Sequence, residues 1–186
     1  MQFSALIIAG GKSKRMGFDK TKQLFKGKSF LQRSIELLQF FSDDILISYN
    51  DELSVPFRVI PDQIKNIGPL GGLHATLPFA RHQHCLVLAA DMPLVNRKTI
   101  AYLISNADFQ KQINILNTNE GYQMLTGIYN KNVFRLIERQ IIEKDYKLSH
   151  LLQKSTFHLI DGRKFDLELV NINTRDDLIK LLKENE

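Results

Sequence analysis

The clearest chemical signal in the sequence is the stretch LIIAGGKSKRMGFDK, in which a glycine pair and several cations follow a short apolar run. Glycine lacks the Cβ atom that would keep a ligand at a distance, so the backbone N–H groups around Gly10 and Gly11 can approach phosphate oxygens closely. Three nearby cations, Lys12, Arg15 and Lys20, can neutralise the charge of a triphosphate. The stretch therefore predicts a phosphate-binding loop.

Two familiar phosphate motifs do not fit this loop. The letters GKS resemble the end of a Walker A loop, but that motif has a glycine five positions before Gly11, where Leu6 stands. The dinucleotide-binding pattern GxGxxG is also absent from the sequence. A merely solvated loop is the alternative, and it accounts for Lys14, Lys22 and Lys26 but explains the glycine pair poorly.

Two aspartates stand directly after apolar runs and are candidate ligand-binding residues. Asp91 follows the run CLVLAA and precedes Met92-Pro93, which predicts a single carboxylate at the end of a strand. Mg²⁺ is commonly held by one or two carboxylates together with substrate phosphates, so Asp91 is a candidate metal ligand. Asp62 lies between FRVI and IGPLGG and can bind sugar or base hydroxyls. Turn formation or helix capping is the alternative for both aspartates.

The segment VNINT near the end of the chain places Asn171 and Asn173 on one face of an extended stretch. Amide side chains two residues apart can form hydrogen bonds with a planar heterocycle. Ordinary capping and turn formation are again the alternative.

The charge of the chain is unevenly distributed. The formal net charge is +5 and the pI is about 9.3, values that are typical of many nucleic-acid binders. However, residues 1–28 contain seven of the 25 Lys and Arg residues and one of the 20 Asp and Glu residues, so the rest of the chain is nearly neutral. A local basic excess fits a compact anion better than a duplex, and we expect no nucleic-acid partner.

The cysteine and histidine content and the lack of targeting patterns indicate the cellular compartment in which the protein is expected. Cys85, the one cysteine, lies in an apolar run and is expected in the core of a protein from a reducing compartment. His82 and His84, in RHQH, are expected to be exposed loop residues, and the five histidines form neither HExxH nor a Cys/His cluster. The sequence has no signal-peptide pattern and no apolar stretch near the ~20 residues of a membrane span. We expect a cytoplasmic protein without a membrane partner.

Strands and helices are expected to alternate in the first hundred residues. Short apolar runs that end in glycine or a polar residue favour buried strands, whereas amphipathic stretches after a capping residue favour helices. Ser29, with Gln32 as capping-box partner, and Asn96 are the expected helix caps, and Pro78 is expected to kink or end its helix. The expected strands are 3–8, 44–49, 57–60 and 85–90, and the expected helices are 29–41, 69–80 and 96–107.

The second half has a less regular pattern. Two strands are expected to pair around Glu120-Gly121, and the last helix is expected to begin at Thr174, where Asp177 can complete a capping box. The expected strands are 111–117, 122–129, 156–160 and 167–171, and the other helices are 131–143 and 148–153.

These patterns predict a single domain over residues 1–186 with a three-layer α/β/α sandwich and a mostly parallel, doubly wound sheet. Ligands of such sheets bind beyond the carboxyl ends of the strands, so the loops after residues 8, 48, 60 and 90 should come together around the ligand.

The motifs also resemble a known family. IIAGGKSKRMGFDK resembles the signature L-x-G-G-x-S-x-R-M-G-x-D-K of nucleotidyltransferases in the nucleotide-diphospho-sugar transferase superfamily, and it is most similar to molybdenum cofactor guanylyltransferases. PDQIKNIGPLGGL, LAADMPLV and VNINTRDDL resemble later motifs of that family in the same order, so the resemblance spans residues 5–178. The fold it implies is nucleotide-diphospho-sugar transferase-like.

The resemblance assigns roles to individual residues. It implies that GTP contacts the strand end and loop, with Asp62 and Asp91 completing the nucleotide site and Asp91 also binding Mg²⁺. Ser48 stands where the family has an asparagine, two residues before Asn50. The middle region reads Gln123-Met124-Leu125, where the family often has Gln-Pro-Leu. The implied nucleotide-binding residues are Ile8, Ala9, Gly10, Gly11, Lys20, Ser48, Asp62 and Asp91; the catalytic residues are Arg15, Lys20 and Asp91; and the acceptor-side residues are Asn171 and Asn173.

The implied reaction is the transfer of GMP from GTP to molybdenum-molybdopterin, with release of pyrophosphate. The implied partners include molybdenum-insertion proteins and molybdoenzyme chaperones. Two alternatives stay open: a sister enzyme with another nucleotide or acceptor, such as the cytidylyltransferase of the same pathway, and a non-catalytic nucleotide-binding protein on the same fold.

Overall fold

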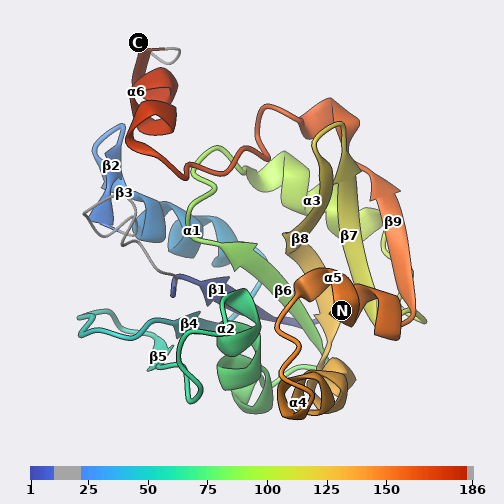
Figure 1. Ribbon diagram of the computed structural model, residues 1–186. Helices are drawn as coiled ribbons and strands as arrows, with labels where there is room; N and C mark the ends of the chain where they lie inside the picture. The colour runs from blue at the N-terminus through green and yellow to red at the C-terminus, as the bar shows by residue number, and fades with distance from the viewer. Residues whose placement is uncertain (11–21, 184–186) are drawn as a thin grey trace.

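A seven-stranded sheet forms the centre of the computed structural model, which describes residues 1–10 and 22–183 (Figure 1). In spatial order the strands are β5 (Arg58–Ile60), β4 (Asp44–Ser48), β1 (Phe3–Ile8), β6 (His84–Ala89), β8 (Gly121–Asn130), β7 (Ile113–Thr118) and β9 (Phe157–Asp161). Only β8 runs antiparallel to the other strands of this sheet. The predicted mostly parallel sheet is confirmed.

Helices cover both faces of the sheet, as predicted. Alternate residues of β1 point to opposite faces: Ala5 and Ile7 belong to one apolar core, and Leu6 and Ile8 to the other. The first core includes residues of α1 (Phe30–Leu38) and α3 (Arg97–Ser105), and the second includes residues of α2 (Pro69–Thr76), α4 (Phe134–Ile142) and α5 (Leu148–Lys154). Because β1 is buried on both faces, its residues are apolar at every position except Ser4.

The predicted caps at the helix starts are confirmed, whereas the helices expected to end at 41, 80 and 107 end at Leu38, Thr76 and Ser105. The Ser29 side chain accepts a hydrogen bond from the Gln32 N–H at 3.1 Å, and the Asn96 side chain accepts from the N–H groups of Lys98 and Thr99. Thr174 and Asp177 form the predicted capping box of α6 (Arg175–Lys183), with bonds of 2.7 and 3.1 Å.

Two helices have 3₁₀ turns at their ends. The α2 helix ends at Thr76, and the chain continues as the 3₁₀ turn η3 (Leu77–Phe79), which contains Pro78. Proline cannot donate the backbone hydrogen bond of a continuing α-helix. The turn η4 (Lys131–Val133) leads directly into α4. No helix within the described ranges is both long and apolar enough to cross a membrane.

The predicted strand 167–171 is wrong. The chain after β9 instead forms the 3₁₀ turn η5 (Arg163–Phe165), and the Phe165 carbonyl accepts hydrogen bonds from the N–H groups of Glu168 and Leu169. Leu169 is buried, but Leu167 is 80% exposed and Val170 is also exposed. One inward side chain in a tight turn therefore replaces the alternating pattern of a strand.

A small hairpin brings the C-terminal segment close to the sheet. β2 (Leu24–Phe25) and β3 (Lys28–Ser29) pair around Lys26-Gly27, and both turn residues have positive φ values, as hairpin turns require. Phe25 and Phe30 pack against Ile172 and Leu181. Figure 1 shows the chain after η5 crossing towards the hairpin, where α6 begins.

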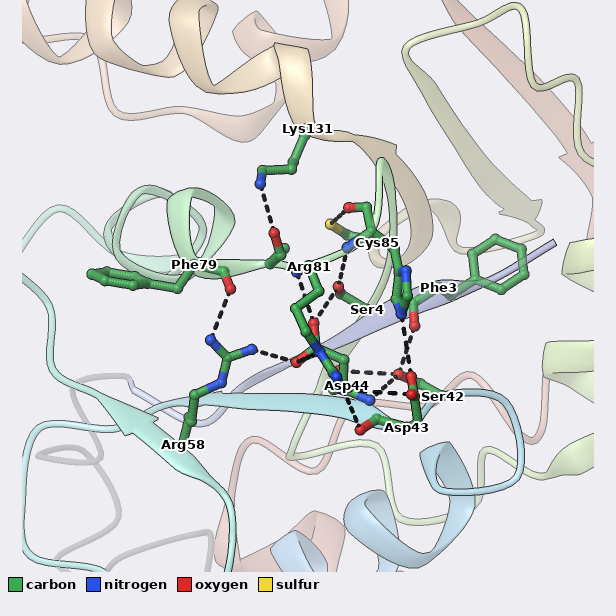
Figure 2. Close-up of polar contacts among 12 residues, drawn as sticks. Phe3, Ser4, Ser42, Asp43, Asp44, Arg58, Phe79, Arg81, Cys85 and Lys131 are labelled. Carbon is green, nitrogen blue, oxygen red and sulfur yellow. Dashed lines mark hydrogen bonds and ion pairs between the residues drawn. The ribbon is translucent and has the colours of Figure 1, made fainter.

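A buried carboxylate ties together the amino ends of the strands, opposite the predicted site (Figure 2). Asp44 on β4 is 3% exposed and accepts hydrogen bonds from the Ser4 hydroxyl, the Arg81 backbone N–H and the Arg58 guanidinium. Burial raises the pKa of Asp44, but these hydrogen bonds outweigh burial and hold it below its ordinary value. The ionised Asp44 thus links β4 to β1, β5 and the segment before β6.

Two histidines near this carboxylate correct the sequence interpretation. His82 contacts the Asp43 carboxylate at 3.2 Å, and His84 begins β6 with its ring against Phe109. Both histidines are half-buried, so the prediction of exposed loop residues is wrong. Burial lowers the pKa of His84 and raises the pKa of the neighbouring Cys85 to about 12; the predicted core position of Cys85 is confirmed.

Candidate active site

The loops that follow four parallel strands come together at the carboxyl end of the sheet, as predicted. The Ala9 N–H donates to the Ser48 carbonyl at 3.0 Å, and the Tyr49 N–H donates to the Ile60 carbonyl at 3.2 Å. On the other side of β1, the Ala90 N–H donates to the Ile8 carbonyl at 3.1 Å. These bonds extend the parallel pairing beyond the strands, so the chain after Ile8 leaves the sheet between the loops of β4 and β6.

The Asp62 carboxylate is fixed by two side chains, one from the last residue of β4 and one from the loop that follows it. The Ser48 hydroxyl donates to Asp62 Oδ1 at 2.9 Å, and Asn50 Nδ2 donates to Asp62 Oδ2 at 3.2 Å. The Asp62 N–H in turn donates to Asn50 Oδ1 at 2.8 Å, which closes a ring between the two residues. We refer to Ser48, Asn50 and Asp62 as the Asp62 network.

Gly10 lies directly beside this network. A Cβ atom at Gly10 would be 3.4 Å from Asn50 Nδ2 and 3.5 Å from both Asp62 Oδ2 and Ser48 Oγ. A methyl group would therefore fit in ordinary contact with all three polar atoms, and it would cover them. Ser48 is buried in any case, but glycine leaves the side chains of Asn50 and Asp62 accessible from the loop side.

Two consecutive glycines bring α2 against the same network. A Cβ atom at Gly72 would be 2.8 Å from Ser48 Oγ and 3.2 Å from Ile8 Cγ2. A Cβ atom at Gly71 would be 3.2 Å from the Ile64 carbonyl and 3.4 Å from Asp62 Oδ2. The pair in PLGG is thus explained by the close approach of the helix to β1, β4 and Asp62.

Asp91 occupies the other side of the β1 end. It follows β6, is partly exposed, and its backbone carbonyl accepts a hydrogen bond from the Ile172 N–H at 2.9 Å. β1 lies between β4 and β6 in the sheet, so Asp62 and Asp91 flank the point at which the glycine loop begins. The predicted single carboxylate at this strand end is confirmed.

The C-terminal segment contributes polar side chains next to Asp91. Ile172 is buried, whereas Asn171 and Asn173 on either side of it are exposed, in agreement with the predicted common face. The backbone bond between Ile172 and Asp91 places both asparagines at the carboxyl end of β6.

For some predicted site residues the structure limits the possible contacts with a ligand or does not describe them. Ile8 has a buried side chain, and its carbonyl already accepts a hydrogen bond from the Ala90 N–H. Ile8 could therefore contact a ligand only through backbone atoms at the end of β1. Gly11, Lys12, Arg15 and Lys20 lie outside the described residues, and their roles stay predictions from the sequence.

The carboxylate at this end of the sheet fits a hard cation that takes one ligand from the protein and others from a bound substrate. Across residues 1–10 and 22–183, no cluster of three or more His, Cys, Asp or Glu side chains could hold a metal ion by itself. The Asp91 carboxylate supplies the type of oxygen ligand that Mg²⁺ prefers, and Mg²⁺ commonly takes its remaining ligands from phosphates and water.

The sequence left open whether Ser48 or Asn50 takes part in the site, and the structure shows both side chains hydrogen-bonded to Asp62. The relation of Asn50 to Asp62 depends on the parallel pairing of β4 and β5, in which Ser48 lies opposite Ile60. The available signal was the alternation of Ser48 and Asn50 around Tyr49, which directs two polar side chains to one face beyond an apolar strand.

Comparisons with known proteins identify the family of this chain. The family model of the MobA-like NTP transferase domain matches residues 5–159. The molybdenum cofactor guanylyltransferase of Syntrophotalea carbinolica is 31% identical over 187 residues, which cover 95% of this chain and 89% of the relative. A Clostridium perfringens protein (strain 13 / Type A) named "Probable molybdenum cofactor guanylyltransferase" is 33% identical over 195 residues, which cover 98% of each chain.

A solved structure shows the same fold. The molybdopterin-guanine dinucleotide biosynthesis protein A of Archaeoglobus fulgidus is 25% identical in sequence, with a TM-score of 0.82 and 98% of each chain covered. The family match runs from within β1 into β9 and includes the loops after β1, β4, β5 and β6, and the relative of 33% identity covers 98% of this chain. This chain therefore belongs to the MobA-like NTP transferase family.

Proposed function

We propose that this protein transfers GMP from GTP to molybdenum-molybdopterin, which yields molybdopterin guanine dinucleotide cofactor and pyrophosphate. The observation that supports it best is the placement of the Asp62 network and Asp91 on opposite sides of the β1 end, where the glycine loop begins. Relatives that share 31–33% of their residues over nearly the full chain are named for this activity.

The Asp62 network suits the sugar or base end of the nucleotide better than its phosphates. An ionised carboxylate only accepts hydrogen bonds, so Asp62 would bind a hydroxyl or N–H donor of the ligand. Ser48 and Asn50 hold this carboxylate in one orientation, and Gly10 leaves it open to the ligand. The phosphates would then extend along the loop after Gly10, towards the predicted cations Arg15 and Lys20.

Asp91 would bind Mg²⁺ together with the phosphates of GTP, and the bound ion would supply additional positive charge at the reacting phosphate. The Asp91 backbone is fixed on both sides, because Ala90 donates to Ile8 and Ile172 donates to the Asp91 carbonyl. Such a fixed carboxylate can orient a ligand without reorganisation during the reaction.

The transfer itself needs no general base from the protein. The terminal phosphate of molybdopterin is already an anion; one of its oxygens attacks the α-phosphorus of GTP, and the bond to the bridging oxygen of pyrophosphate breaks. Catalysis then consists of holding the two substrates in line and neutralising charge on the phosphates. Gly11 N–H, Arg15 and Lys20 would provide this on the nucleotide side.

Asn171 and Asn173 would contribute to the acceptor side. Both are exposed next to Asp91, and their amides can form hydrogen bonds with the edge of a pterin ring. We propose that the reaction takes place in the cytoplasm, with molybdenum-insertion proteins and molybdoenzyme chaperones as protein partners.

A thermal-shift panel with GTP, CTP, ATP and UTP, each with and without Mg²⁺, tests the nucleotide assignment. A ligand at 100 times its dissociation constant adds ~2.7 kcal/mol to the stability of the folded state, which corresponds to a Tm increase of roughly 5–11 °C in a chain of this size. We expect this shift with GTP and Mg²⁺. A selective shift with CTP would favour the cytidylyltransferase, and no shift with any nucleotide would contradict the proposal.

A further inference from the structure

Strand β8 departs from its pairing with β7 at one place. Ile115 of β7 pairs with Gly127, but the next residue, Leu116, pairs with Gln123. Three residues of β8, Met124–Thr126, therefore have no partner on β7, and we refer to them as the β8 bulge. Bulges of this kind often redirect a strand next to a functional site.

The pairing with β6 places the bulge at the carboxyl end of the sheet. Thr126 pairs with Leu88, and this is the last pair between the two strands. β6 ends at Ala89 and the chain goes on to Asp91, whereas β8 runs in the opposite direction, so Leu125 and Met124 extend to the same end of the sheet. In Figure 1 the connection between β7 and β8 lies at this end as well.

A second contact joins the bulge to the catalytic end of β6. The Thr126 hydroxyl donates to Met92 Sδ at 3.1 Å, and Met92 directly follows Asp91. The residues of the bulge thus form the side of the site that faces away from the Asp62 network, because β1 and β6 lie between them.

A buried hydroxyl holds the shape of the bulge. Tyr129 is 2% exposed, and its hydroxyl donates to the Met124 carbonyl at 2.5 Å, across the bulge of its own strand. Burial raises the pKa of Tyr129, so the hydroxyl remains a donor at neutral pH. A phenylalanine would fill nearly the same volume, so the hydroxyl matters for this bond rather than for packing.

Gly127 fixes where the bulge begins. A Cβ atom at this position would be 2.7 Å from the Asn114 carbonyl and 2.8 Å from Ile115 Cγ2. The two strands are therefore close together at Gly127 and separate only beyond it. In addition to the contact between Thr126 and Met92, the bulge is therefore held by close strand packing at Gly127 and by the hydrogen bond to the Met124 carbonyl.

We propose that Tyr129 is a positioning residue for the acceptor: by holding the Met124 carbonyl, it sets the Gln123–Leu125 segment as a wall of the acceptor pocket beside Asp91. This inference rests on the proposed function and adds a residue that touches neither substrate. Loss of the Tyr129 hydroxyl should affect binding of the acceptor but not of GTP, because the Asp62 network lies on the far side of β1.

Tyr129→Phe tests this role, with Tyr146→Phe as a matched control that removes a phenol hydroxyl from the exposed loop between α4 and α5. For Tyr129→Phe we expect the KM for molybdenum-molybdopterin to rise about three- to tenfold, the range that the loss of one buried hydrogen bond produces. The Kd for GTP, measured by calorimetry, should stay within twofold. Tyr146→Phe should match the wild type in both.

Two further measurements extend the test, and the second does not depend on the stability of Tyr129→Phe. Hydrogen exchange should become faster in residues 122–126 of Tyr129→Phe and not in the control. Thr126→Val, which removes the hydrogen bond to Met92 Sδ, should also raise the KM for molybdenum-molybdopterin.

An unchanged acceptor KM in an active Tyr129→Phe enzyme would overturn the inference, as would an equal loss of GTP affinity, which would indicate general loosening. A wild-type protein without transfer activity would overturn the proposed function itself, and the inference with it.

Discussion

Gly10 and Gly72 both lie close to the Ser48 hydroxyl, and adding a methyl group to each should have different consequences. At Gly72, the new Cβ would be 2.8 Å from Ser48 Oγ, so α2 or Ser48 must move. Overpacking of this kind costs ~1–3 kcal/mol, which corresponds to a Tm decrease of roughly 2–12 °C for a chain of this length. Gly72→Ala should therefore reduce stability.

At Gly10, the new Cβ would have no neighbour closer than 3.4 Å, so Gly10→Ala should leave the Tm within about 2 °C of the wild type. The same methyl group would cover the polar atoms of Asn50 and Asp62. The loss of a hydrogen bond with a charged group costs ~1.5–3 kcal/mol, so the Kd for GTP should rise roughly 10- to 150-fold.

Calorimetric titration with GTP and a thermal melt, at one pH and one Mg²⁺ concentration, give the Kd for GTP and the Tm of each variant. The reasoning predicts that Gly10→Ala is stable but binds GTP poorly. GTP binding at the wild-type level by Gly10→Ala would refute the idea that the nucleotide reaches the Asp62 network beside Gly10.

Three other substitutions test separate parts of the account. Asn50→Ala removes two bonds to Asp62 from an exposed side chain, so the Kd for GTP should rise about three- to tenfold with little change in Tm; unchanged affinity in the titration would exclude a role for Asn50. Lys20→Ala should weaken GTP binding and slow transfer by roughly one to two decades each, and steady-state kinetics with no effect on either would assign Lys20 to the solvated lysines. Asp44→Asn should lower the Tm at pH 7 by roughly 6–20 °C, because the neutral amide loses the charge that pairs with Arg58 and turns an NH2 donor towards groups that now donate to the carboxylate. Because the pKa of Asp44 is lower in the folded state, the ionised carboxylate stabilises the fold above the unfolded-state pKa of ~3.9, and this stabilisation is lost as the pH falls through the folded-state pKa. The difference in Tm between Asp44→Asn and the wild type should therefore be smaller in melts below about pH 4. A Tm difference that does not change with pH would contradict this linkage.

The parts of the fold that depend on local pattern could be predicted from the sequence. The apolar run at 3–8 and the capping residues Ser29 and Asn96 determine their elements through short-range contacts. The position of Asp91 also follows from local pattern, since an apolar strand delivers it to the carboxyl end of a parallel sheet.

The parts that depend on contacts between distant segments could not be predicted. Asn50 and Asp62 meet because two strands pair in parallel, and Asp44 is buried because groups from residues 4, 58 and 81 converge on it. The β8 bulge requires the pairing register of β7 and β8, which no single segment encodes. The strand at 167–171 was wrongly predicted because two leucines two residues apart have a strand pattern, although a tight turn exposes one of them.

The central claim is that this chain joins GMP, and not another nucleotide, to molybdopterin. The most direct test is to incubate the wild-type protein and Asp91→Ala with molybdenum-molybdopterin, Mg²⁺ and either GTP or CTP labelled at the α-phosphate, and to measure the label in the dinucleotide cofactor. The account predicts labelled cofactor from GTP with the wild type, and less than a tenth of that rate with Asp91→Ala. Label from CTP alone, or a folded wild-type protein that transfers label from neither nucleotide, would contradict it.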